Sequence, residues 1–549
     1  MSKKPFVVCL LNGMGIEEAK SYNIYSNEVM PTLDQLTTRY LFSTISASGK
    51  GVGLSEAASA TREIGLLNLG SCSTIKQSIE IINSKIETNT FFNNQALATV
   101  IDHVKANNSN MHLITLIGDK YGEDSLVHLR KMVEYLNGIG IKKVCLHLYL
   151  GANSNPLVKS FPKYTAMIHR ILNVYPDTKI SIVAGIKFLK DSSGITITKE
   201  LYKVSAGGIG EHWINYNDAV DSNYKRKYLE QDIVPFIVHD NVLIGNTDGV
   251  FLFNYENDLG SVYTDLLVQP NKYMYTNNTG INIKVASLFP LQNQTSVSCF
   301  NYEPVKTSFY GSLNNKGIKH LLIAPKEDIP YINYYFNGCN NMQAAQVLGI
   351  EPTNTGNYDN DLNYIYQATT TKLIEAINSN FYDLIIVEYN IANGNISTEN
   401  IKTSMNNVDK NLTNIYNQVI GMNGTLYITS CYGLNTVIYN NKDELVNVNF
   451  SKKLPFIVVD NEMSKDIYSV TSGTISDIGT TILNNLEVPL MEGMSVKNLI
   501  LKSNTKKGGK AKKRGKKTIL ILVIAIAIIA ILVVVLFTMG LIWKKTDSH

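Results

Sequence analysis

Short apolar runs alternate with helical patterns along the first 500 residues. Runs rich in Val, Ile and Leu that end at polar residues or glycine are typical of strands covered on both faces. These runs are Phe6–Leu11, Leu113–Ile117, Lys143–Leu150, Ile180–Val183, Gly249–Asn254, Ile318–Ala324, Leu384–Val387 and Leu426–Thr429. Stretches such as Asp124–Leu136 and Thr370–Asn378 predict helices between them. The alternation predicts an α/β protein with a parallel sheet, and 549 residues favour two globular units.

The most uniform apolar segment lies near the C-terminus. Residues 518–543 carry no charged side chain, consist almost wholly of Ile, Leu, Val and Ala, and end in Trp543. About 20 apolar residues cross a bilayer core as a helix, and tryptophan suits the membrane interface. The segment therefore predicts one C-terminal transmembrane helix, followed by a short tail at 544–549.

Basic residues precede this segment and set its predicted orientation. The stretch 502–517 is rich in Gly and Lys and predicts a disordered tether. Because positive charge favours the cytoplasmic side, we expect a tail-anchored, single-pass cell-membrane protein with a cytoplasmic body. The tether could bind anionic lipid, or its charges could only fix the topology. Besides Lys502 at its start, the basic residues expected to face lipid are Lys506, Lys507, Lys510, Lys512, Lys513, Arg514, Lys516 and Lys517.

The body ahead of the tether is mildly acidic. Of 50 Lys and Arg and 46 Asp and Glu residues, eleven basic and one acidic residue follow residue 500, which leaves 39 and 45 in the body. A nucleic-acid-binding body usually presents a basic face, so we expect no nucleic-acid partner. The six cysteines lack the paired spacing of a zinc or redox motif.

Polar loops follow the predicted strands, where α/β folds collect their chemistry. In the order and amino-acid sequence of these loops and their neighbours, the chain resembles the cofactor-independent (2,3-bisphosphoglycerate-independent) phosphoglycerate mutases of the alkaline phosphatase superfamily. The matching pieces are Leu11–Gly15 (L-D-G-W-G in the family), Glu63–Gly70 (E-V-G-H-L-N-I-G), Phe253–Tyr255 (F-N-F-R), Tyr334–Gly338 (F-F-F-N-G-G) and Ile475–Leu483 (D-I-A-P-T-I-L).

The resemblance implies two domains and a site between them. An alkaline-phosphatase-like parallel-sheet domain would be split into residues 1–74 and 310–501, with a transferase-like α/β domain inserted at 77–305. The family's active site uses two Mn or Mg ions, a serine that is phosphorylated in turn, and arginines that hold the phosphoglycerate.

The family's catalytic and metal positions carry other residues here. Its nucleophilic serine corresponds to Arg62, which cannot form a phosphoester, and its catalytic lysine corresponds to Asp328. Thr61 is one residue out of register, so we expect its side chain to point elsewhere. A two-metal site needs carboxylate and imidazole ligands. The corresponding residues are Asn12, Asn393, Ser397, Cys431, Tyr432 and Asn449, so we expect no metal cofactor.

The positions that bind phosphoglycerate in the family are changed as well. An arginine guanidinium binds a phosphate through two parallel hydrogen bonds. None of the family's substrate-binding arginines is retained here. The corresponding residues are Glu123, Asn153, Ser154, Ile186, Glu256 and Leu259. The acidic side chains of Glu123, Glu256 and Asp328 would repel a phosphorylated acid, so we expect no binding of the family's substrate.

Three hypotheses describe such a chain. The leading one is a catalytically inactive pseudoenzyme that acts as a membrane-tethered scaffold, assembling with itself or with an unknown protein partner. The second is an active metal-dependent phosphatase, phosphodiesterase or mutase of the same superfamily with altered ligands. The third is a ligand-sensing cleft for a cationic or neutral molecule. Metal content, turnover and stabilisation by ligands distinguish them.

Overall fold

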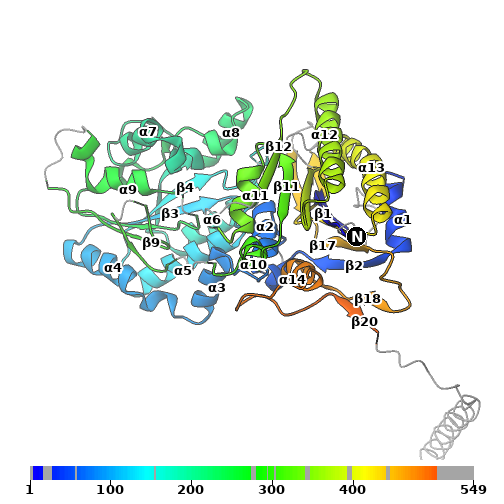
Figure 1. Cartoon of the computed structure of the whole chain (residues 1–549). Helices are drawn as coiled ribbons and strands as arrows, with labels where there is room; N and C mark the ends of the chain where they lie inside the picture. Colours follow the sequence, from blue (N-terminus) through cyan, green and yellow to red (C-terminus); the bar gives the residue numbers. More distant parts are fainter. Residues whose placement is uncertain are drawn as a thin grey trace, which may run out of the picture. The chain divides into compact units, whose positions relative to one another are not determined.

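The computed structural model describes most of the chain up to residue 503, and residues up to Leu501 form one compact unit. Figure 1 shows this unit as two groups of strands with helices packed around each. The described ranges are 4–16, 28–55, 58–153, 156–256, 258–273, 280–292, 295–301, 305–339, 346–391, 398–439 and 445–503.

The first sheet is centred on β1, which lies between two parallel neighbours. Phe6 of β1 pairs with Leu384 of β13 on one side and with Thr425 of β14 on the other. The main path runs β12-β11-β13-β1-β14-β17-β2-β19, and β15 joins β1 to β16. The strands are β1 (Phe6–Met14), β2 (Leu41–Ser46), β11 (His320–Pro325), β12 (Gln346–Ile350), β13 (Leu384–Asn390), β14 (Thr425–Thr429), β15 (Gly433–Tyr439), β16 (Leu445–Phe450), β17 (Lys453–Val459) and β19 (Gly473–Thr474).

The second sheet comes from the middle of the chain. Its order is β10-β9-β8-β3-β4-β5-β7-β6, and its central strands β3, β4, β5 and β8 are parallel. Its strands are β3 (Met111–Ile117), β4 (Val144–Leu150), β5 (Lys179–Gly185), β6 (Glu211–His212), β7 (Phe236–Ile237), β8 (Gly249–Leu252), β9 (Lys284–Ser287) and β10 (Val297–Ser298). Two short strands, β18 (Tyr468–Val470) and β20 (Ile500–Lys502), pair separately.

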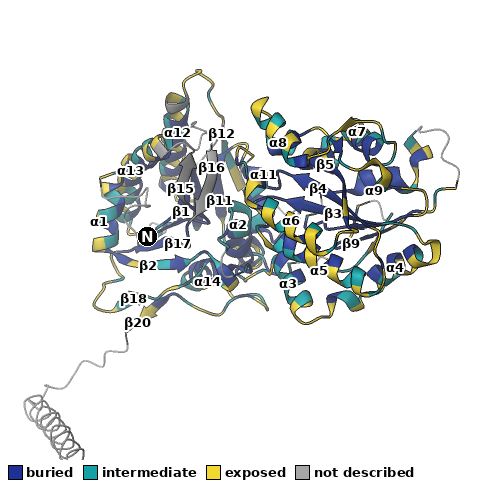
Figure 2. Cartoon of the chain, turned by 180° about the vertical axis from the view of Figure 1, so that it is seen from behind, coloured by how far each residue is buried: buried dark blue, intermediate teal, exposed yellow. Residues whose placement is uncertain are grey.

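The helices bury their apolar faces on the two sheets. Figure 2 shows central strands such as β3 and β4 in the buried colour and the outward faces of the helices in the exposed colour. Central strands such as β3 and β4 are buried at every residue, as expected of parallel strands covered on both faces. The predicted α/β class with parallel sheets is thereby confirmed. The helices are α1 (Pro31–Arg39), α2 (Arg62–Ser71), α3 (Ser78–Glu87), α4 (Gln95–Asn107), α5 (Asp124–Gly138), α6 (Thr165–Val174), α7 (Ile195–Ser205), α8 (Tyr216–Lys225), α9 (Ser261–Val268), α10 (Phe309–Lys316), α11 (Ile329–Phe336), α12 (Tyr358–Asn378), α13 (Thr398–Gly421) and α14 (Ile475–Asn485).

Two glycines let α2 lie directly against neighbouring backbone. A Cβ on Gly65 would stand 1.9 Å from the carbonyl oxygen of Cys431, and one on Gly70 would stand 2.3 Å from the Cα of Phe336. Any larger side chain would push the helix away. The N-terminus of α2 is therefore held beside the loop that follows β14.

No helix within the described ranges is long and apolar enough to cross a bilayer. The predicted membrane helix at 518–543 lies outside the described residues, as do the tail at 544–549 and the tether from residue 504 onward.

Candidate active site

A buried ionic cluster lies where β1 and β13 end and α2 begins. We call Asn12, Arg62, Asp328 and Glu388 the Arg62 cluster. Arg62 donates from Nη1 to Asp328 Oδ1 and from Nη2 to Glu388 Oε1, both at 2.7 Å. Asn12 Nδ2 donates to Glu388 Oε1 at 2.6 Å. The cluster thus joins α2 to both central strands and to the residue that precedes α11.

Burial and charge together define the state of this cluster. The side chains of Arg62, Asp328 and Glu388 are 18%, 11% and 0% exposed. Burial alone would lower the pKa of Arg62, but Glu388 and Asp328 raise it, so the guanidinium stays charged. Burial raises the pKa of Glu388, although Arg62 acts in the opposite direction. Asp328 Oδ2, Glu388 Oε2 and Arg62 Nε are buried without a hydrogen-bond partner.

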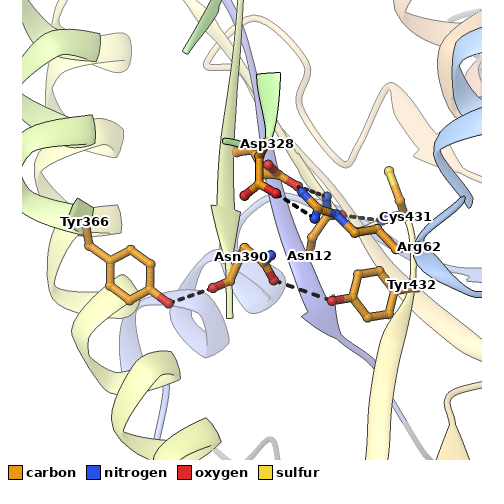
Figure 3. A network of polar contacts seen from close by, with 8 residues as sticks. Asn12, Arg62, Asp328, Tyr366, Asn390, Cys431 and Tyr432 are labelled. Carbon is orange, nitrogen blue, oxygen red and sulfur yellow. Dashed lines mark hydrogen bonds and ion pairs between the residues drawn. The ribbon is translucent and has the colours of Figure 1, made fainter. Parts of the chain in front are cut away.

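The loop after β14 packs against the same cluster (Figure 3). Asn12 Oδ1 accepts a hydrogen bond of 2.9 Å from the backbone amide of Cys431. Tyr432 donates to Asn390 Oδ1 at 3.5 Å, and Tyr366 donates to the Asn390 carbonyl at 2.9 Å. The predicted site residues Asn12, Arg62, Asp328, Cys431 and Tyr432 therefore come together in space.

Glu388 was missed by sequence reasoning. It is the one carboxylate in the otherwise apolar and aromatic start of β13, Leu384–Tyr389. A charged residue at the end of an apolar strand signals a buried polar partner, and that signal could have pointed to Arg62.

The described residues do not fit a two-metal site. The Arg62 guanidinium bonds both carboxylates of the cluster, and it repels a cation there. Within the described ranges, no group of three or more His, Cys, Asp or Glu side chains could hold a metal ion. Asn393 and Ser397 lie outside the described residues, as does the side chain of Asn449.

The predicted substrate positions fall into separate environments. Ile186 and Leu259 belong to the core, at 4% and 1% exposure. Asn153 accepts from the Asp119 amide and donates to Glu230, and Glu123 is the residue just before α5. Ser154 lies outside the described residues. Glu256 alone of the six lines the cavity described next.

A cavity of about 580 Å³ lies between elements of the two sheets, and we call it the central cavity. A hollow of about 640 Å³ beside β12 and α12 is larger but is lined by one Lys and one Glu only, apart from neutral residues. The central cavity gathers far more reactive side chains, as binding sites do. Its polar lining comprises Ser59, Thr61, Glu63, Gln77, Ser78, Asp119, Lys120, Tyr121, Tyr255, Glu256, Asp258, Tyr334, Tyr335 and Cys339.

Thr61 lines this cavity, whose lining does not include Arg62 or the other residues of the Arg62 cluster. It is the residue before α2 and makes no side-chain hydrogen bond to the helix amides. Glu63, two residues further along, lines the same cavity. Burial raises the pKa of Glu63, but hydrogen bonds from Thr61 and Tyr331 lower it overall. Glu63 is therefore a carboxylate at neutral pH.

The chain belongs to the Metalloenzyme superfamily, whose family pattern it matches over residues 4–490. The curated relatives are named 2,3-bisphosphoglycerate-independent phosphoglycerate mutases. The Clostridium botulinum protein is 27% identical over 546 residues, covering 91% of this chain and 100% of its own. The Mycoplasmopsis pulmonis protein is 23% identical, covering 91% and 99%.

A solved structure shows the same fold over nearly the whole chain. The phosphoglycerate mutase of Leishmania mexicana, crystallised at low cobalt concentration, superposes with a TM-score of 0.67. It is 16% identical and covers 92% of this chain and 98% of its own. The fold therefore agrees with that implied by the sequence motifs.

These relatives contradict the prediction of an inactive, scaffold-forming pseudoenzyme. They carry the name of an enzyme and align with about 90% of this chain. The prediction of no cofactor is also corrected, because the family is described as metalloenzymes. The findings favour the second hypothesis, an active member of the superfamily with altered ligands.

The prediction of a tail-anchored, single-pass membrane protein is corrected by the same findings. The relatives are named as phosphoglycerate mutases, and the family match ends at residue 490, before the segment on which that prediction rested. Contact of the tether with anionic lipid, a protein partner or self-assembly, and the lack of a nucleic-acid partner stay predictions.

Proposed function

We propose that this protein is an enzyme that transfers the phosphoryl group of a small phosphomonoester in the central cavity, with Thr61 as the first acceptor. One observation carries the proposal: Thr61, the residue before α2, lines the cavity together with Glu63, and it is one of the groups that lower the pKa of the Glu63 carboxyl. Membership of a family of phosphoryl-transfer enzymes supports it.

The N-terminus of α2 suits an incoming phosphate. The first intrahelical bond runs from the Gly65 amide to the Thr61 carbonyl at 2.9 Å, so the preceding helix amides have no helical acceptor. These amides and the helix dipole favour an anion. Lys120 lies in the same cavity, where it forms an ion pair of 2.7 Å with Glu256.

The transfer can be written with these side chains. Glu63 accepts the Thr61 proton as Thr61 Oγ1 bonds to phosphorus and the ester oxygen leaves. Lys120 supplies a proton to the departing oxygen. Attack on the phosphothreonine by a second hydroxyl of the substrate would complete a mutase cycle, and attack by water would complete a phosphatase cycle. The described residues do not fit the family's metal pair, so no step is assigned to it.

The Arg62 cluster positions Thr61 without touching the substrate. Arg62 is the first residue of α2, and its two ion pairs hold that end of the helix on β13 and on the residue before α11. Asn12 links the same carboxylate to the loop after β14. Arg62 is therefore a positioning residue.

The test is an assay of the full chain on 2-phosphoglycerate, 3-phosphoglycerate and p-nitrophenyl phosphate, with Mn²⁺, Mg²⁺ or Co²⁺ and without added metal. We expect turnover that falls to background in Thr61→Val, while Thr38→Val on the exposed face of α1 keeps full activity. Mass spectrometry should find phosphate on Thr61 after a rapid quench. Lack of turnover of these esters and of 2-aminoethyl phosphate under all these conditions, or unchanged activity of Thr61→Val, would overturn the proposal.

A further inference from the structure

The charge of the central cavity is strongly unbalanced. Among the described residues that line it are four carboxylates, those of Glu63, Asp119, Glu256 and Asp258, and one ammonium group, that of Lys120. Lys120 Nζ lies 2.7 Å from Glu256 Oε1, so the two charges largely offset each other. Burial raises the pKa of Glu256, but Lys120, a hydrogen bond with Tyr121 and the charge of Lys190 lower it overall, and Glu256 stays ionised. The cavity therefore attracts cations and repels a ligand that carries only negative charge.

Tyrosine rings form much of the remaining wall. Tyr121 and Tyr255 lie with ring centroids 4.7 Å apart, and Tyr334 and Tyr335 with centroids 5.2 Å apart. The face of a tyrosine ring attracts an ammonium group that stands over it. Lys120 lies 6.0 Å from the centroid of Tyr121. Among the described residues, no Lys or Arg side chain stands over the rings of Tyr334 and Tyr335.

We infer that the central cavity binds a small organic cation, the ammonium-bearing part of the substrate. This inference rests on the proposed function for the phosphoryl group and adds the chemistry of the group attached to it. Phosphoglycerate combines a phosphate with a carboxylate, and the acidic wall disfavours it. A phosphomonoester of an amino alcohol places its phosphate at α2 and its ammonium group among the carboxylates and tyrosines. Its internal positive charge offsets the repulsion.

The binding step is tested first, without catalysis. Calorimetric titration of the full chain with tetramethylammonium chloride, against sodium chloride as the ionic-strength control, should show saturable binding. Glu256→Gln and Tyr335→Leu should each weaken it about tenfold, while Lys120→Gln should strengthen it. Glu351→Gln and Tyr364→Leu, which alter exposed side chains far from the cavity, should leave it unchanged. Lack of saturable binding by the folded wild-type chain overturns the inference.

Turnover of a matched pair of esters separates this inference from the proposed function. 2-Aminoethyl phosphate and 2-hydroxyethyl phosphate differ only in an ammonium group against a hydroxyl. We expect at least a tenfold higher kcat/KM for the ammonium ester. Equal or lower kcat/KM for that ester overturns the inference and leaves the proposed function standing. Binding of tetramethylammonium without turnover of any ester supports the cation site and overturns the proposed function.

Discussion

Arg62 and Asp328 form a hydrogen-bonded ion pair of 2.7 Å between the first residue of α2 and the residue before α11. The sequence motifs predict that these two positions correspond to a serine and a lysine in the mutase family. The ion pair joins the start of α2 to the residue before α11.

Removal of the Arg62 side chain should destabilise the protein strongly. Arg62→Ala leaves Asp328 and Glu388 buried without their counter-charge, and breaking a buried pair in this way costs about 3–5 kcal/mol. Denaturation by urea should report this loss. Arg39→Ala on the exposed face of α1 is the control and should change the free energy of unfolding by less than about 1 kcal/mol.

The same variant should gain affinity for divalent cations. Without the guanidinium, two carboxylates joined by it in the wild type share one pocket of negative charge, which favours a hard cation. Mn²⁺ should therefore raise the Tm of Arg62→Ala more than that of the wild type. An equal or smaller Mn²⁺-induced shift in the variant would show that the two carboxylates do not act together.

Glu63→Gln should slow phosphoryl transfer by about 10²–10⁴-fold, the usual contribution of a general base. Hydrogen bonds lower the pKa of Glu63 despite its burial. The wild-type rate should therefore fall only when the pH drops below the ordinary pKa of a glutamate side chain. That acid limb should be absent from the pH profile of Glu63→Gln. An identical acid limb in both proteins would assign the proton acceptor elsewhere.

His128 should make stability depend on pH. Burial lowers its pKa from 6.5 to about 3, so the unfolded chain binds a proton that the folded chain refuses between these values. Stability is full above about pH 6.5 and falls as the pH drops toward 3, by up to about 1.4 kcal/mol per pH unit. His128→Gln should flatten this dependence in urea titrations at several pH values. His212→Gln, at an exposed strand residue, should keep the wild-type slope.

Gly65→Ala should displace α2 and impair catalysis. Its Cβ would stand 1.9 Å from the Cys431 carbonyl oxygen, a backbone atom that cannot turn away. We expect a loss of about 1–3 kcal/mol together with reduced kcat. Gly138→Ala, at the end of α5 with open space around it, should be neutral or stabilising by up to about 1 kcal/mol. Similar behaviour of the two variants would show that α2 has room to move.

The strands were predictable because their chemistry is local. The apolar run Phe6–Leu11 lies within β1, which continues to Met14 because Gly13 and Met14 pair with β15. The predicted helix at Thr370–Asn378 is the C-terminal half of α12. The first half of α12 was not predicted to be helical, although Asn357 caps the helix by accepting a hydrogen bond from the Asn360 amide.

The site was only partly predictable because its contacts are not local. Arg62 and Glu388 are 326 residues apart, and no spacing rule connects them. The motifs singled out Arg62 and Asp328 as positions that differ from the family, which stays a prediction, and they carried no information that the two would pair. The central cavity that Thr61 lines could not be predicted, because a residue ahead of a helix has extended backbone, with φ −77° and ψ 175°, and does not follow the helical rotation.

Two ion pairs on its first residue fix the rotation of α2 about its own axis. Thr61 directly precedes Arg62, so a rotation of the helix would also displace Thr61 relative to the cavity wall. Such a rotation would break the ion pairs of the Arg62 guanidinium and is therefore disfavoured. The direction of the proposed acceptor hydroxyl of Thr61 therefore depends on the ion pairs of the next residue, Arg62.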